Sequence, residues 1–576
     1  MATVVIQLMD VPAFGQRKRK ESESAPGDLR LREAELVFMD GMKYFILEDY
    51  TKALGSFQRV AELNPQESMV YFKIAEIYSK SESQDDHLRA GASIEQAIRL
   101  NKKNSNYYLL AAEIYTKQNN FPKAEAMLET LTREVGDNGD HLYLLANIYQ
   151  FDNKPLEAIK TYDRAEALFG INELSSLQKQ KLYLDLGKLD EAIMEGEKLL
   201  AAFPDEERYV MGFAEILSKK GQQKKGIEYL EKFLKTHPES GSSKILLAGL
   251  YREVGRDKES RDLLMQAFED PSVDISTKII VLETYVAQIT HAAARNTQDP
   301  DIASFAVSLY QQMIAQSPGD PNVYIAGGDL FLSLRQKDNA QRAFLGAVQH
   351  GSASFEAWQN LLSLESEAGN YDSLIFHSDQ GLEIFPNQAM LYYYNGYGHL
   401  QKRHFREATF SLERAKRLSS ANPALLHDIN SMLGEAYNGT KEYVKSDAAY
   451  DAALAFNPKD EYVLNNYSFY LSIRKEHLEK AEHMSSQLIR DHPANASYLD
   501  THAWVLYARE KFKEARKVAE RALELPDASA VMYEHYGDIL FRLDDVDGAV
   551  RQWEKARSLT SQHERIDKKI ANRRLY

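Results

Sequence analysis

The sequence contains no cysteine, and this absence excludes several kinds of chemistry. None of the 576 residues can form a disulfide, act as a thiol nucleophile or bind a metal as a thiolate. The 15 histidines are scattered, and no spacing places two of them on one helix face as a helical metal site requires. The glycines form no phosphate-binding loop either. We therefore expect no enzymatic activity, no cofactor and no metal ion.

Positive charge and long apolar runs are also scarce. Lys and Arg number 70 against 85 Asp and Glu, which gives a formal net charge of -15. Such a balance disfavours nonspecific binding to nucleic acid or to an anionic membrane surface. No run of 18 apolar residues occurs, and the mean hydropathy is -0.47. We therefore expect no nucleic-acid partner and no integral membrane span.

What the sequence does contain is a repeat of 34 residues. Mostly small residues recur at this spacing in three runs. A fixed period of this length is typical of a solenoid, in which each repeat buries its apolar face against its neighbours. Such a chain offers an extended surface, so interaction is favoured over catalysis. The three runs are Ala90, Ala124, Ala158, Ala192, Gly226 and Ser260; Ala306, Ala340, Leu374 and Ala408; and Ala481, Ala515 and Ala549.

Each repeat has the pattern of two amphipathic helices. Within residues 139–172, apolar residues three or four apart form one stripe on each helix. A polar break at 152–155 separates the helices, and Pro155 stands where the second helix would begin. The first stripe holds Leu142, Leu145, Ala146 and Tyr149, and the second holds Ala158, Tyr162 and Ala165.

These patterns resemble the tetratricopeptide repeat (TPR) family, which places Gly and an aromatic residue on a first helix, Ala-aromatic-Ala on a second, and a closing Pro. About fifteen repeats fit between Ala34 and about Ser561, with local departures at Gln180, Leu374 and Ser378. The resemblance implies an all-α fold, an α-α superhelical solenoid of about fifteen TPR helix pairs with a C-terminal capping helix. The best matches are Gly41, Tyr44, Ala53, Phe57 and Pro65; Tyr324, Gly328, Phe331, Ala340, Phe344 and Ala347; and Tyr533, Gly537, Ala549, Trp553 and Ala556.

Breaks in the 34-residue phase suggest how the chain is divided. Between Ser260 and Ala306 the spacing is twelve residues longer than one repeat, and the polar stretch 292–301 is predicted to be an extended loop between helices. This loop is either a tolerated surface insertion or a segment that contacts a partner or flexes. We expect four segments: a tail or signal-like segment at 1–30, TPR arrays at 34–275 and 276–562, and a polar capping helix at 563–576.

The N-terminal segment leaves the compartment open. Residues 1–16 are mostly apolar and end in small residues, and a basic run follows at 17–20. This order resembles a weak or truncated secretory signal, which favours the periplasm or cell envelope. However, no basic residue precedes the apolar stretch and Asp10 interrupts it, so a cytoplasmic chain with a solvated tail is the alternative.

Candidate binding residues follow from the resemblance. In the family, the first helix of each pair lines a concave groove, and its outward positions contact ligands. Here those positions are rich in aromatic and polar side chains, which suit peptide binding. The alternative is that the tyrosines pack between repeats. The groove candidates are Tyr393, Tyr394, Tyr397, Asn465, Asn466, Phe469, Trp504, Glu534 and Asp538.

The favoured function is a scaffold or adaptor that binds other proteins or peptides in the groove. Residues 465–471 and 498–507 are similar to stretches of large bacterial TPR proteins of the cell envelope, which implies an envelope or secretion assembly. The alternatives are a cytoplasmic adaptor or assembly chaperone, and a regulatory subunit of a separately encoded enzyme. The family's Lys-Asn-Arg clamp for peptide carboxylates is missing, and the sequence leaves self-association open.

Overall fold

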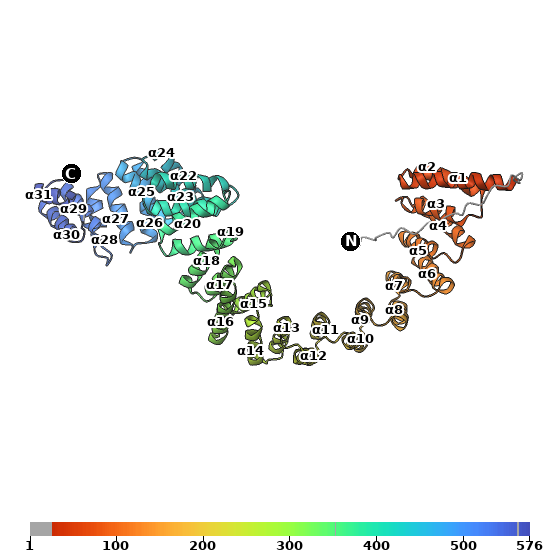
Figure 1. The fold of residues 1–576 in the computed structure, drawn as a ribbon. Coiled ribbons are helices and arrows are strands. Elements are labelled where there is room, and N and C mark those ends of the chain that lie inside the picture. The colour runs from red at the N-terminus through yellow and green to blue at the C-terminus, as the bar shows by residue number, and fades with distance from the viewer. Residues whose placement is uncertain (1–25, 352, 562–563) are drawn as a thin grey trace. The chain divides into compact units, whose positions relative to one another are not determined.

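The computed structural model describes residues 26–351, 353–561 and 564–576. These residues form 31 α-helices and no strand, so the predicted all-α fold is confirmed. Thirty of the helices form fifteen consecutive pairs, and α31 follows them (Figure 1). The chain divides into two compact units, which we call unit 1 (up to Leu264) and unit 2 (Met265–Tyr576). The division passes through α14, whereas the sequence suggested one at 275/276, which stays a prediction.

Unit 1 consists of short helices joined by brief turns. Its helices are α1 (Pro26–Ile46), α2 (Tyr50–Leu63), α3 (Ser68–Ser79), α4 (Gln84–Leu100), α5 (Ser105–Lys117), α6 (Phe121–Val135), α7 (Gly139–Phe151), α8 (Pro155–Phe169), α9 (Glu173–Asp185), α10 (Leu189–Ala202), α11 (Glu207–Lys219), α12 (Gln223–Thr236), α13 (Gly241–Glu253) and the first part of α14 (Asp257–Glu269).

Unit 2 continues the same alternation. Its helices after α14 are α15 (Ile275–Ala294), α16 (Pro300–Gln316), α17 (Pro321–Ser333), α18 (Lys337–Gln349), α19 (Phe355–Glu367), α20 (Tyr371–Ile384), α21 (Ala389–Gln401), α22 (Phe405–Leu418), α23 (Pro423–Gly439), α24 (Tyr443–Phe456), α25 (Glu461–Arg474), α26 (Leu478–Asp491), α27 (Ala496–Ala508), α28 (Phe512–Leu523), α29 (Ala530–Arg542), α30 (Val546–Ser558) and α31 (Glu564–Asn572).

The two helices of a pair approach closely because small residues stand at their contact. Ala340 in α18 is fully buried, and Gly328 in α17 lies against the ring of Phe344. A Cβ atom at Gly328 would lie 2.5 Å from that ring, so a larger residue would force the pair apart. The small residues at this contact therefore allow the two helices of this pair to pack closely.

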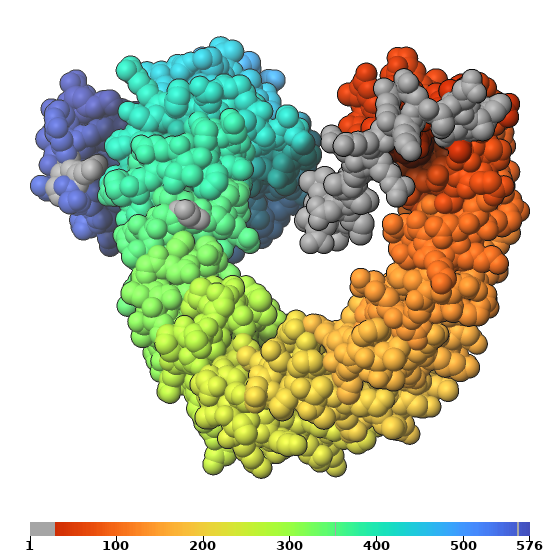
Figure 2. Space-filling view, turned by 45° about the vertical axis from the view of Figure 1, so that its right-hand side comes forward, coloured from red at the N-terminus to blue at the C-terminus, as the bar shows by residue number. Residues whose placement is uncertain are grey.

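The first helix of each pair lies on the inner side of its stack. Strong contacts between helices that are two apart join first helices only, for example α3 with α5, α11 with α13, and α25 with α27. Successive second helices make no contact of similar extent among the described residues. In Figure 2, colours that follow each other in sequence adjoin each other in space within each unit. The inner face of unit 2 is therefore built from α15, α17, α19, α21, α23, α25, α27 and α29.

The predicted extended loop at 292–301 is wrong. Only residues 295–299 separate α15 from α16, and these helices are 20 and 17 residues long. The extra residues of this repeat mostly lengthen its two helices. Asp299 ends the loop, because its side chain accepts a hydrogen bond from the amide of Asp301 at 2.9 Å and Pro300 opens the helix.

The described structure begins with the first repeat helix and ends with an additional helix after the last pair. α1 begins at Pro26, and the predictions for residues 1–16 lie outside the described residues. At the other end, α31 is the predicted capping helix, and it buries Ile566 and Lys569. Among the described residues, no helix has the length and apolar character that crossing a membrane requires.

Candidate binding surface on the inner face of unit 2

The nine groove candidates share three positions of the first helices. Each is the fifth, sixth or ninth residue of α21, α25, α27 or α29. Residues four apart lie on one helix face, so these positions form a common strip along the inner side. All candidates but one are partly exposed, which a binding surface requires. The exception is Asp538, which is 3% exposed.

An aromatic stack joins three of these helices. The Trp504 ring of α27 lies parallel to the His535 ring of α29, with centroids 4.0 Å apart. The other neighbour of Trp504 is Tyr507, at 4.6 Å, and Phe469 of α25 lies 6.3 Å from His535. We call Phe469, Trp504, Tyr507 and His535 the Trp504 stack. It presents a large aromatic area with polar edges, which is typical of interaction hot spots.

His535 is held in place by a buried carboxylate. Its Nδ1 lies 3.0 Å from both carboxylate oxygens of Asp500, which is 9% exposed. The candidates taken from the sequence do not include His535 or Asp500. The signal was present, since His535 is the sixth residue of α29 and Asp500 the fifth of α27, both strip positions.

The tyrosines of α21 are shared between the surface and the core. Tyr393 and Tyr394 meet edge to face with centroids 5.3 Å apart, and Tyr397 meets Tyr371 at 5.9 Å. Burial, and to a lesser degree the nearby Asp428 carboxylate, raises the pKa of Tyr393 to about 12. Each ring therefore packs between repeats on one side and remains partly exposed on the other. The interpretation that these tyrosines pack between repeats is confirmed in part, and their role in binding a partner stays a prediction.

The paired asparagines of α25 leave one acceptor unused. Asn465 Nδ2 donates to Asn466 Oδ1 at 3.4 Å. Asn465 Oδ1 is buried and has no hydrogen-bond partner among the described residues. An unsatisfied buried carbonyl costs free energy.

Glu534 and Asp538 do not form an open part of the groove. The Nζ of Lys569 in α31 is fully buried, 2.6 Å from Glu534 Oε1 and 2.6 and 2.7 Å from the two oxygens of Asp538. Trp553 Nε1 also donates to Asp538 at 2.9 Å. Burial raises the pKa of Asp538, and the Lys569 and Trp553 contacts oppose this rise. The prediction of an exposed position is wrong for Asp538, because the capping helix occupies it.

An acidic group lies nearer the start of unit 2. Glu283, Asp329 and Glu356, from α15, α17 and α19, all have exposed side chains. Although Asp329 reaches solvent, surrounding protein partly shields its carboxyl, and this burial, with Glu356 and Glu283, raises its pKa to about 6. We call these three residues the acidic patch. No group of three or more metal-ligating side chains gathers anywhere in the described chain.

Comparison with known proteins identifies the repeats. Models of the tetratricopeptide repeat match residues 82–148, 211–240 and 501–559, and the last range contains Trp504 and His535. Protein CTR9 homolog of Arabidopsis thaliana is 21% identical over 434 residues, which cover 70% of this chain and 37% of that protein. TPR repeat-containing protein YpiA of Bacillus subtilis is 22% identical over 431 residues, covering 68% of this chain and 98% of that protein.

Solved structures of such repeats are also similar. One is a tetratricopeptide repeat protein from Parabacteroides merdae, which is 14% identical and has a TM-score of 0.36. The similarity covers 44% of this chain and 98% of that one.

Proposed function

Because the chain is a tetratricopeptide repeat protein, we propose that it is a non-catalytic scaffold or adaptor that binds other proteins or peptides along the inner face of unit 2. The observation that carries the proposal is the Trp504 stack, on the same strip as Asn465 and Asn466. Stacked aromatic rings supply apolar contact area, and the partly exposed amide side chains supply directional hydrogen bonds. The two together suit a protein segment.

The charges of this face specify the partner further. The acidic patch favours Lys or Arg in the bound segment. Apolar or aromatic side chains would pack on Trp504 and Phe469. We therefore propose a partner segment that alternates basic and apolar residues.

We also propose that the protein works in a bacterial envelope or secretion assembly. Two features support this: the signal-like residues 1–16, and the similarity of 465–471 and 498–507 to envelope TPR proteins. A cytoplasmic adaptor or assembly chaperone is the alternative, and the intact mass of the purified native chain distinguishes the two. A chain that begins near Arg17 supports export, and one that retains residue 1 supports the cytoplasm. A third candidate, a regulatory subunit, requires that a catalytic chain co-purify with it.

Affinity capture of the tagged chain from its native cells tests the binding proposal. We expect Tyr393→Ala/Trp504→Ala to reduce partner recovery at least tenfold, because both side chains are partly exposed on the strip. The matched control is Phe376→Ala/Phe410→Ala, which removes rings that are 58% and 64% exposed on the second helices α20 and α22. Equal recovery with both double variants, at unchanged thermal stability, would overturn the proposal.

A further inference from the structure

One repeat of unit 1 has a polar core. Three buried positions of α9 hold Ser176, Lys179 and Gln180. The neighbouring first helices carry apolar residues 34 positions before and after them, and these are also buried. The replaced residues correspond to Leu142, Leu145 and Ala146 in α7 and to Val210, Phe213 and Ala214 in α11.

The departure at Gln180 is accommodated by a glycine opposite it. The neighbouring repeats have Tyr162 and Leu230 where this repeat has Gly196. A Cβ atom on Gly196 would lie 2.3 Å from the Phe213 ring and 2.7 Å from Gln180 Nε2, so the glycine leaves space that both side chains fill. Gln180 Nε2 donates to the Ala192 carbonyl at 3.3 Å. A polar amide therefore fills part of a contact that is apolar in the neighbouring repeats.

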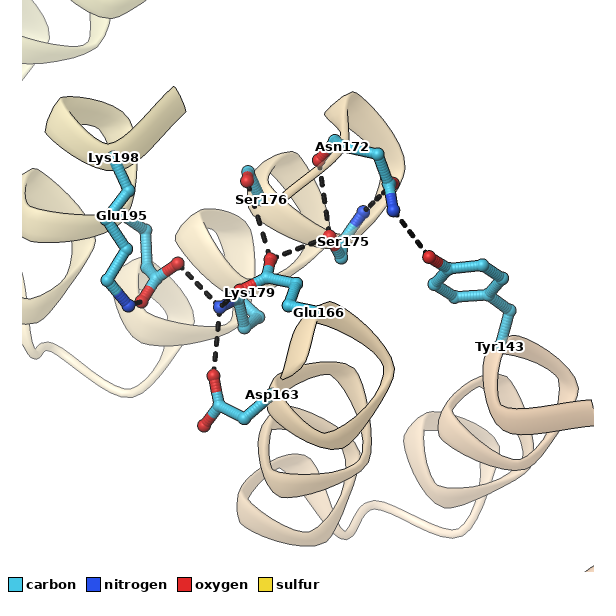
Figure 3. Close-up of polar contacts among 9 residues, drawn as sticks. All are labelled: Tyr143, Asp163, Glu166, Asn172, Ser175, Ser176, Lys179, Glu195 and Lys198. Carbon is cyan, nitrogen blue, oxygen red and sulfur yellow. Dashed lines mark hydrogen bonds and ion pairs between the residues drawn. The ribbon is translucent and has the colours of Figure 1, made fainter. Parts of the chain in front are cut away.

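A buried cation joins this repeat to the one before it (Figure 3). Lys179 Nζ lies 2.9 Å from Asp163 and 2.5 Å from Glu166, both in α8, and 2.7 Å from Glu195 in α10. The Lys179 side chain is fully buried, and the side chains of Glu166 and Glu195 are nearly so. Burial lowers the pKa of Lys179, but its carboxylate partners outweigh this and raise the pKa above the ordinary value. The side chain therefore remains a cation.

Three other junctions of unit 1 are joined differently. In each of them a tyrosine of a first helix donates to a glutamate of the preceding second helix: Tyr251 to Glu231 at 2.7 Å, Tyr149 to Glu129, and Tyr115 to Glu95. Asp163 stands 34 residues after Glu129, and it binds Lys179 instead. The polar contacts between α8 and α9 thus centre on one cation among three carboxylates, and Ser175 of α9 also donates to Glu166 at 2.6 Å.

We propose that the α8–α9 junction is a polar hinge, the place where unit 1 opens locally before its apolar junctions do. In a solenoid each junction is stabilised by its own contacts, so a weak one opens without the others. Burial of apolar surface is the main stabilising term, and a buried ion cluster loses in dehydration much of what it gains in attraction. When the junction opens, Lys179 and the carboxylates regain favourable hydration free energy. The side chains of an apolar junction have no such gain when they are exposed to water.

Hydrogen exchange of the full chain under native conditions tests the hinge. We expect the amides of α9 to exchange at least tenfold faster than those of α7 and α11 in the same protein. Equal protection of the three helices would overturn the proposal. This comparison is made within the wild-type protein and requires no variant.

Substitutions test whether the ion cluster is the cause. Glu166→Leu/Lys179→Leu/Glu195→Thr introduces the residues that neighbouring repeats carry at these positions, Leu200, Leu145 and Thr161. It should slow exchange in α9 at least tenfold. Lys179→Met should accelerate exchange in α8 to α10 at least tenfold, because it leaves the buried Glu166 carboxylate without a cation and Glu195 with Lys198 alone. The exposed Lys181 of the same helix gives the control Lys181→Met, which should change nothing. If Lys179→Met behaves as this control does, the cluster does not close the junction.

Discussion

At the scale of single residues, His502 is the clearest case of a titratable side chain placed in the core. It lies in α27 between repeats, and its Nδ1 is 2.8 Å from Ser485 Oγ of α26. Burial lowers the pKa of His502 to about 4, and Glu482 opposes this only in part. The imidazole is therefore neutral in the folded protein at physiological pH.

This shift predicts that unit 2 loses stability in mild acid. The folded pKa of about 4 is below the unfolded value of 6.5, so between them the unfolded chain binds the extra proton. Stability is complete above pH 6.5 and falls by about 3 kcal/mol as the pH approaches 4. Urea unfolding at a series of pH values, followed by tryptophan fluorescence, measures the stability of unit 2. The only tryptophans are Trp358, Trp504 and Trp553, and all lie in this unit. His502→Gln should flatten this pH dependence and His291→Gln, at an exposed site, should not; an unchanged slope in His502→Gln would contradict the assignment.

The sequence could identify which residues stand at strip positions, but not whether each of them is exposed or covered by another part of the chain. Asp538 and Trp504 are both the ninth residue of a first helix, so the repeat pattern treats them alike. Lys569, which decides that Asp538 is buried, belongs to α31, and no repeat position corresponds to it. The sequence shows that Gln180 departs from the repeat pattern. It does not show the cluster around Lys179, because that cluster depends on which carboxylates of the neighbouring helices lie close to Lys179 in space. Such cross-repeat contacts need coordinates.

At the scale of helices, the turn inside most pairs repeats one backbone conformation. The second residue before the second helix adopts a left-handed φ, as at Asn119, Asn153 and Gly187, which follow one another at intervals of 34 residues. The following amide bonds back to the first helix, as that of Asn120 does to the Tyr115 carbonyl at 2.8 Å. This Schellman geometry ends the first helix and reverses the chain.

The turn predicts a cost at Gly187, where φ is 72°. Gly187→Ala should destabilise the α9–α10 pair by about 1–2 kcal/mol, because a Cβ atom is unfavourable in the left-handed region. No atom lies within 4 Å of the added Cβ, so the effect comes from the backbone alone. Gly212→Ala, inside α11 and equally open, should be neutral or stabilising. Hydrogen exchange of each pair measures both; a loss in Gly212→Ala as large as that in Gly187→Ala would contradict this account.

Helix existence was predictable from the sequence, and helix length was less so. The 34-residue spacing fixes one contact per pair, and it predicted about fifteen pairs, where the described residues form fifteen. Between Ser260 and Ala306 that spacing fails, and the extra polar residues were assigned to a loop. They instead extend α15 and α16, because polar residues on an exposed helix face satisfy their backbone within the helix. Additional residues in a repeat can therefore lengthen a helix as readily as they lengthen a loop.

At the scale of the whole molecule, the repeats supply stability and the differences between them supply specificity. Within each unit, every helix packs mainly on its neighbours in sequence, so inner-face side chains can vary without affecting distant repeats. Unit 2 uses this freedom for the acidic patch, the tyrosines of α21 and the Trp504 stack. The central claim is that this strip binds a protein segment.

Site-specific photocrosslinking in native cells tests that claim most directly. A photoreactive phenylalanine analogue replaces Phe469 on the strip or, as a matched control, Phe410 on α22. Phe410 is 64% exposed, so accessibility alone favours the control. We expect a discrete crosslinked partner from position 469 and none from position 410. A partner captured from position 410 and not from position 469 would contradict the inner-face binding surface.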